Sequence, residues 1–143
     1  MIVIDANVLI YAYDATDRRH PAVAPWFQRQ MAGPDDVGLS LVAIMAFLRI
    51  STDHRVFEHP RPVATALAIV DSWLARPNAR LLEPTGRHWE TLLDLAAGGQ
   101  ARGPQLMDAH LAALTIEHGA TLATADRGFA RYAGLRTVDP TAA

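Results

Sequence analysis

The sequence contains no cysteine and no lysine, and all 13 of its strongly basic side chains are arginines. Without cysteine the chain can form no disulfide, zinc–thiolate site or iron–sulfur cluster, and it has no thiol nucleophile. Without lysine it can form no Schiff base and has no Walker-type phosphate-binding lysine. Any chemistry must therefore come from carboxylates, histidines, hydroxyls and arginines.

The sequence also lacks a strong net charge and a long apolar run. The formal net charge is −2, so no global positive field indicates a nucleic-acid partner, although local groups of arginines can still hold phosphate. The most apolar stretch, residues 37–48, is interrupted by Gly38 and Ser40 and is too short to span a bilayer. We expect no leader or membrane segment, and the absence of cysteine favours the reducing cytoplasm.

Length and periodicity predict one domain over residues 1–143, since half of the side chains are hydrophobic and no linker or repeat divides the chain. Short buried strands alternate with helices, which predicts an α/β fold with a mostly parallel sheet flanked by helices on both faces. The expected strands are residues 2–4, 37–39, 79–84, 120–125 and 135–138, and the expected helices are residues 7–13, 21–32, 41–50, 62–76, 89–96 and 105–119.

Two acidic residues follow predicted strands. Asp5 comes directly after the strand at residues 2–4, and Asp126 comes shortly after the strand that contains Leu122 and Ala123. Ligands of an open parallel sheet bind beyond the carboxyl ends of its strands, so both acids are expected at the same edge. Either residue alone could equally be a helix N-cap, a position that aspartate prefers.

A third acid, Asp108, lies near the start of a helix that is apolar on almost every side. A charge in such surroundings is costly unless a partner compensates it, although a first-turn acid is also favoured by the helix dipole. Three carboxylates at one edge, with no lysine nearby, would repel one another. A divalent cation would relieve this repulsion, and oxygen ligands favour Mg²⁺ or Mn²⁺.

Three stretches of the sequence resemble PIN-domain ribonucleases, and within them the VapC toxins of bacterial VapBC toxin–antitoxin systems. They are "MIVIDANVLIYAYD", "AFLRIST" and "DAHLAALTIEHGATLATADRGFARYAGLRTVDP", so the resemblance covers nearly the whole chain. It implies a three-layer PIN fold and metal-dependent hydrolysis of RNA phosphodiester bonds by Mg²⁺ or Mn²⁺. Asp5, Asp108 and Asp126 resemble the family's catalytic metal ligands, and Asn7 matches its small polar position. The resemblance further implies a VapB-like antitoxin partner and a homodimer.

One position departs from the family pattern. PIN nucleases commonly carry a glutamate immediately before the equivalent of Phe47, whereas this chain has Ala46. Asp53 is too far along the same helix to replace it, at roughly 10 Å, and Glu117 is rotated to the opposite helix face from Asp108. Two readings stay open: an active site with three carboxylates, or a catalytically impaired domain that binds RNA or antitoxin only.

Other residues near the predicted site have weaker assignments. Arg49 lies one helical turn after Ala46 and could contact an RNA phosphate or pair with a site acid, and Arg127 could contact RNA. His110 is two residues beyond Asp108 on a helix, so it should face away and be structural.

A different enzyme class, the haloacid-dehalogenase-like phosphatases, also places an aspartate after its first strand. Those enzymes need a second aspartate two residues later and a lysine. Asn7 occupies that position and the chain has no lysine, which argues against this class.

Overall fold

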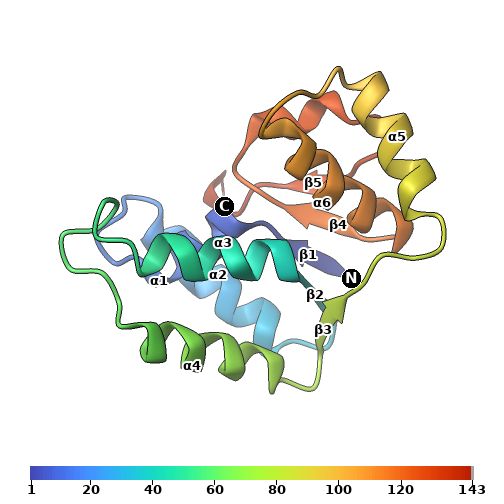
Figure 1. The fold of residues 1–143 in the computed structure, drawn as a ribbon. Helices are drawn as coiled ribbons and strands as arrows, with labels where there is room; N and C mark the ends of the chain where they lie inside the picture. Colours follow the sequence, from blue (N-terminus) through green and yellow to red (C-terminus); the bar gives the residue numbers. More distant parts are fainter. Residues whose placement is uncertain (143) are drawn as a thin grey trace.

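The computed structural model describes residues 1–142 and contains one five-stranded sheet with the strand order β3-β2-β1-β4-β5 (Figure 1). The strands are β1 (Ile2–Ile4), β2 (Val37–Ser40), β3 (Ala79–Leu82), β4 (Thr121–Ala123) and β5 (Thr137–Val138). Each neighbouring pair is parallel. The predicted α/β fold with a parallel sheet is therefore confirmed.

Six α-helices and two short 3₁₀ helices connect and cover the strands. They are α1 (Ala6–Tyr13), α2 (His20–Ala32), α3 (Leu41–Ser51), α4 (Val63–Leu74), α5 (His88–Gly98), α6 (Gln105–Glu117), η1 (Arg127–Arg131) and η2 (Pro140–Ala142). Figure 1 shows α1 to α4 on one side of the sheet and α5 with α6 on the other. No helix within residues 1–142 is both long enough and apolar enough to cross a membrane.

The two faces of the sheet belong to two hydrophobic clusters, as the alternation of side chains along a strand requires. Ile4 packs with Val8, Leu9 and Phe47 on the side of α1 to α3. Val3, its neighbour in β1, packs on the other side with Ala109 and other residues of α5 and α6. Both side chains are fully buried. The sheet therefore lies between two layers of helices, and Asp5 follows the carboxyl end of β1 directly.

The ends of two helices form as the sequence predicts. Ser40 precedes α3, and its hydroxyl accepts a hydrogen bond of 3.0 Å from the backbone N–H of Ala43. Gly119 lies just after α6 with φ of 65°, a conformation that costs glycine little because it has no Cβ. These residues set where α3 begins and where the chain turns into β4.

The buried Ser40 cap gives a stability prediction. Ser40→Ala leaves the Ala43 N–H without its partner, so the free energy of unfolding should fall by about 1 kcal/mol. Urea denaturation would measure this loss, with Ser72→Ala as the control because Ser72 is exposed within α4. An equal effect of the two substitutions would show that the cap contributes nothing.

Candidate active site

Asp5 lies where β1 ends and α1 begins, and hydrogen bonds hold both oxygens of its carboxylate. Oδ1 accepts from the N–H of Ala6 at 2.7 Å, and Oδ2 accepts from the hydroxyl of Thr124 at 2.7 Å. The backbone N–H of Asp5 also donates to the carbonyl of Ala123 at 3.0 Å, which continues the pairing of β1 with β4. Asp5 is therefore the N-cap of α1 and also faces the end of the neighbouring strand.

Thr124 is a site residue that the sequence reasoning missed. It is buried, with 4% of its surface exposed, and it directly follows β4. Its hydroxyl donates to Asp5 and accepts a hydrogen bond of 3.0 Å from the backbone N–H of Asp126. A small hydroxyl residue two positions before the strand-end acid, in "ATLATAD", was the available signal. Thr124 links the carboxylate of Asp5 to the backbone that carries Asp126.

Asp126 is exposed and caps the short helix η1. Its Oδ1 accepts a hydrogen bond of 2.8 Å from the backbone N–H of Gly128. A Cβ atom on Gly128 would lie 3.0 Å from that same oxygen, so a larger residue would crowd the carboxylate. Asp126 is held at the carboxyl end of β4, beside Asp5 at the carboxyl end of β1.

Asp108 reaches the same edge from the first turn of α6. Burial, together with the negative charges of Asp5 and Asp126, raises the pKa of the Asp108 carboxyl to about 6, whereas Arg131 opposes the shift. Burial likewise raises the pKa of Asp5 against the hydrogen bonds from Thr124 and Ala6, and the charge of Asp126 adds to the increase. The fold thus brings the three predicted acids into one electrostatic neighbourhood.

The donor set suits a hard divalent cation. The Oδ1 atom of Asn7 is buried and lacks a hydrogen-bond partner among residues 1–142, and the three carboxylates add further oxygens. Within those residues, no three acidic or histidine side chains converge closely enough to form a complete metal site by themselves. Mg²⁺ is commonly held by one or two carboxylates and several waters, and the residues present fit that mode of binding.

No nearby acid takes the place of the glutamate that PIN nucleases commonly have where this chain has Ala46. Asp53 forms an ion pair of 3.0 Å with Arg55 beyond the end of α3. Glu117 accepts hydrogen bonds of 2.9 Å from the Thr85 N–H and from the ring of His88. The prediction that Glu117 points away from Asp108 is confirmed.

His110 is held within the contact between α5 and α6. Its Nδ1 lies 2.9 Å from Nε2 of His88, so the prediction of a structural role for His110 agrees with its surroundings.

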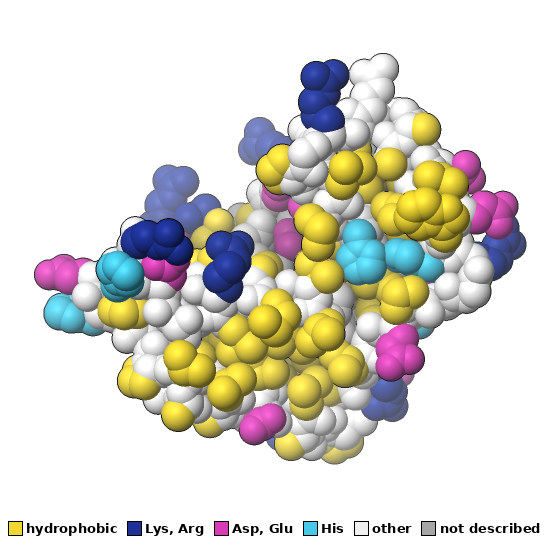
Figure 2. Space-filling model, in the orientation of Figure 1, with side chains coloured by type: hydrophobic (Ala, Val, Ile, Leu, Met, Phe, Trp, Pro, Cys, Tyr) yellow, Lys and Arg dark blue, Asp and Glu magenta, His cyan; other side chains and the backbone are white. Residues whose placement is uncertain are grey.

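The predicted arginines lie on the surface. Arg49 and Arg127 are exposed. No ion pair between Arg49 and an acid is found in the part of the chain described, which favours the alternative of a phosphate contact, and that contact stays a prediction. Figure 2 shows acidic side chains in a hollow between the surface over α3 and the surface over α5 and α6, with arginine side chains around it. An anionic polymer that approached this hollow would contact the arginines around it before it reached the acids within it.

The double role of Thr124 gives a second stability prediction. Thr124→Val keeps the volume but removes both hydrogen bonds, so the free energy of unfolding should fall by about 1–3 kcal/mol. Thermal denaturation with Thr115→Val as control would measure it, since the buried Thr115 hydroxyl only donates to a carbonyl within its own helix. Equal stability of Thr124→Val and the parent protein would exclude this linking role.

The charge of Asp108 should destabilise the metal-free protein. Folding raises the pKa of Asp108 from its ordinary value near 4 to about 6. Between these two pH values, Asp108 is protonated in the folded state but has lost its proton in the unfolded state. Stability should therefore fall as the pH rises through this window. At pH 8, Asp108→Asn should raise the free energy of unfolding by roughly 1–2 kcal/mol, a reduced value because the side chain is partly exposed to water.

Chemical denaturation in EDTA at pH 8 and at pH 5 would test this, with the exposed acid Asp94 changed to Asn as control. The gain from Asp108→Asn should shrink at pH 5. A loss of stability at pH 8 would contradict the proposed repulsion.

Known proteins resemble this chain in sequence and in fold. The family model of the PIN domain matches residues 2–135. Ribonuclease VapC37 of Mycobacterium tuberculosis is 37% identical over 142 residues, which is 99% of both chains. Ribonuclease VapC43 of the same organism is 39% identical over 140 residues, covering 98% of this chain and 95% of that protein.

Two solved structures share the fold at lower sequence identity. The sarcin-ricin loop cleaving toxin VapC20 of Mycobacterium tuberculosis superimposes with a TM-score of 0.70 at 20% identity and covers 98% of this chain and all of its own. A DNA-bound VapBC of Salmonella typhimurium gives a TM-score of 0.63 at 18% identity, over 97% of each chain. With the sequence matches spanning nearly its full length, this chain belongs to the PIN-domain family and, within it, groups with the VapC proteins.

Proposed function

We propose that this protein is a metal-dependent endoribonuclease that hydrolyses RNA phosphodiester bonds as the toxin of a type II toxin–antitoxin pair. The observation that carries the proposal is the gathering of Asp5, Asp108 and Asp126 at an edge free of lysine, where the charge of Asp126 raises the pKa of Asp5 and both charges raise the pKa of Asp108. Its curated relatives, which match over nearly the full length, are named ribonucleases.

Asp5, Asp108 and Asp126 would hold the Mg²⁺ or Mn²⁺ ion, with the unpartnered oxygen of Asn7 beside them. When bound, such an ion polarises a phosphoryl oxygen and lowers the pKa of its water. The protein's own part is to orient the carboxylates through Thr124 and to hold the RNA backbone. Arg127 and Arg49 are exposed and suit contacts to phosphate oxygens.

The absence of the usual glutamate does not by itself favour a binding-only domain. Asp5 and Asp108 are acids with raised pKa values, and keeping their charges near one another costs stability. A domain without metal chemistry would be more stable with neutral residues at these positions. We therefore favour an active site with three carboxylates and additional water on the metal over the catalytically impaired alternative.

A VapB-like antitoxin is the proposed partner. Structural neighbours include VapBC2 of Rickettsia felis bound to a promoter fragment and a toxin–antitoxin complex from Klebsiella pneumoniae. Figure 2 shows hydrophobic side chains exposed over α4 and again over α5 and α6, among them Leu67 and Trp89, which are 47% and 69% exposed. Such patches are typical of interaction surfaces. We assign them jointly to the antitoxin and to a homodimer, acting in the cytoplasm.

Cleavage of a panel of structured RNAs tests the proposed activity. Metal-stripped protein should be inactive, and Mg²⁺ or Mn²⁺ should restore cleavage. Asp5→Asn should lower the rate at least about a hundredfold, the scale of losing one group that stabilises charge in the transition state. The matched control is Asp139→Asn, because Asp139 directly follows β5 at the same edge but lies outside the proposed set.

Cleavage that persists in EDTA, or in Asp5→Asn, would exclude the proposed mechanism. If no RNA is cut at enzyme excess but Ala46→Glu restores metal-dependent cleavage, the catalytically impaired alternative is correct.

A further inference from the structure

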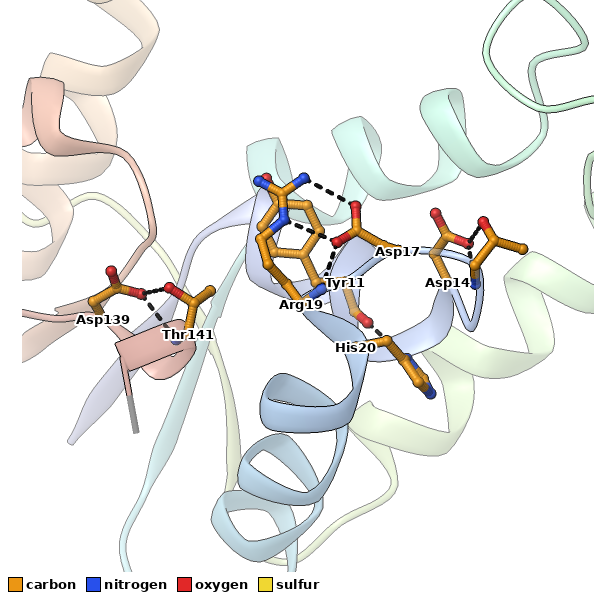
Figure 3. Close-up of polar contacts among 8 residues, drawn as sticks. Tyr11, Asp14, Asp17, Arg19, His20, Asp139 and Thr141 are labelled. Atoms are coloured by element: carbon orange, nitrogen blue, oxygen red, sulfur yellow. Dashed lines mark hydrogen bonds and ion pairs between the residues drawn. The ribbon is translucent and has the colours of Figure 1, made fainter.

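A cation and an aromatic ring are stacked on the flank of α1. The Cζ atom of Arg19 lies 3.8 Å from the centroid of the Tyr11 ring, so the guanidinium covers one face of the ring (Figure 3). The side chain of Arg19 nevertheless remains 35% exposed. A planar, positively charged group supported from below by an aromatic ring is a surface on which another flat ring can stack.

The position of Arg19 is fixed by Asp17. Nε and Nη2 of Arg19 donate to the two oxygens of Asp17, each at 2.9 Å, and the backbone N–H of Arg19 donates to Asp17 at 2.8 Å. The hydrogen bond from Arg19 lowers the pKa of Asp17 to about 2, so the carboxylate stays charged at physiological pH. A bidentate pair of this kind fixes the plane of the guanidinium and reduces the entropy lost when a ligand stacks on it.

The backbone of Tyr11, which carries the ring beneath Arg19, is anchored as well. Nδ1 of His20 lies 2.8 Å from the carbonyl oxygen of Tyr11, which ties the first residue of α2 to α1. Because the turn between these helices is also held by Asp14, whose Oδ1 accepts from the N–H and the hydroxyl of Thr16, the stack is not the only contact that orders it.

The stack lies close to the proposed active site. Tyr11 is four residues after Asn7 in α1, so the two side chains share one helix face with Cβ atoms about 5–6 Å apart. Asp5 caps the same helix. Tyr11 lies six residues after Asp5, about 9 Å along the helix axis, so an RNA strand whose phosphate reaches Asp5 can extend to the stack.

We propose that the Tyr11–Arg19 stack binds a nucleobase of the RNA substrate, which lies on the outward face of the Arg19 guanidinium beside the scissile phosphate. Proteins that bind single-stranded RNA commonly stack unpaired bases on aromatic rings or on arginine planes. The inference rests on the proposed ribonuclease function. It specifies a substrate with an unpaired base near the cleaved bond.

Binding of a fluorescently labelled single-stranded RNA of mixed sequence, measured in EDTA so that no cleavage occurs, tests the proposal. Tyr11→Leu keeps an apolar side chain but removes the ring, and Arg19→Lys keeps the charge but removes the plane. Each should weaken binding about tenfold. Tyr11→Phe keeps the ring and should bind within about twofold of the parent.

Arg18→Gln is the matched control for charge, since Arg18 is exposed next to Arg19 and is not part of the stack. Its loss should reduce the salt dependence of binding, whereas Tyr11→Leu should leave that slope unchanged because no phosphate contact is lost. The second readout uses RNAs with a single abasic position placed in turn along the strand. When the abasic position is the stacked one, removing the base from the RNA and removing the ring by Tyr11→Leu should lower the binding affinity by the same factor. Combining the two changes should lower the affinity no further.

Circular dichroism and melting temperature show whether each variant is folded. If Tyr11→Leu does not fold, the test of the base-binding site relies on Arg19→Lys, because this substitution changes a side chain at the surface and is better tolerated by the fold. Folded variants that bind like the parent, or that lose equal affinity for every abasic RNA, would overturn the stack as a base-binding site. Failure of the unaltered protein to bind or cut any RNA would instead refute the proposed function, so the two failures are distinguishable.

Discussion

The hydroxyl of Thr124 joins the ends of the neighbouring strands β1 and β4 at the point where the acidic residues emerge. By donating to Asp5 and accepting from the backbone of Asp126, it sets the orientation of one carboxylate relative to the loop that carries another. The starts of two helices depend on this arrangement, because Asp5 is the N-cap of α1 and Asp126 is the N-cap of η1. The parallel pairing of β1 with β4 places both strand ends at one edge, and Thr124 supplies the connection between them.

The acids that the proposed chemistry needs also lower the stability of the folded state. Asp108 on α6 faces the charges of Asp5 and Asp126, and burial makes the charged form still less favourable. Repulsive groups that persist at one edge of an otherwise well-packed fold are typical of sites built to bind a counter-charge. Because the chain has no lysine and the arginines nearby lie at the surface, the acids would be neutralised by the proposed metal ion, and the arginines would contact the proposed RNA substrate.

Arg19 differs from Arg49 and Arg127 in how its side chain is held. Arg19 is fixed in a plane by Asp17 and Tyr11, whereas Arg49 and Arg127 are exposed side chains without an ion pair among the acids of residues 1–142. A planar group held in place suits recognition of a base, and exposed charges without a partner acid suit contacts to phosphates, which differ little from one nucleotide to the next. Both kinds of contact would be needed to hold RNA while its backbone lies at the acids.

The alternation of short apolar strands with helices determined the α/β class, and local rules determined the cap at Ser40 and the helix end at Gly119, because these depend on neighbours within a few residues. The same reasoning placed Asp5 and Asp126 at one edge, since parallel strands end together. Only the tertiary structure decided which groups complete that edge. The hydrogen bond from Thr124 to Asp5, the His88 contact of Glu117, the exposed position of Arg49 and the stacking of Arg19 on Tyr11 all depend on segments that meet through folding. The spacing in "ATLATAD" marks Thr124 as a candidate, but it does not show that the partner of Thr124 is Asp5, which lies far away in the sequence.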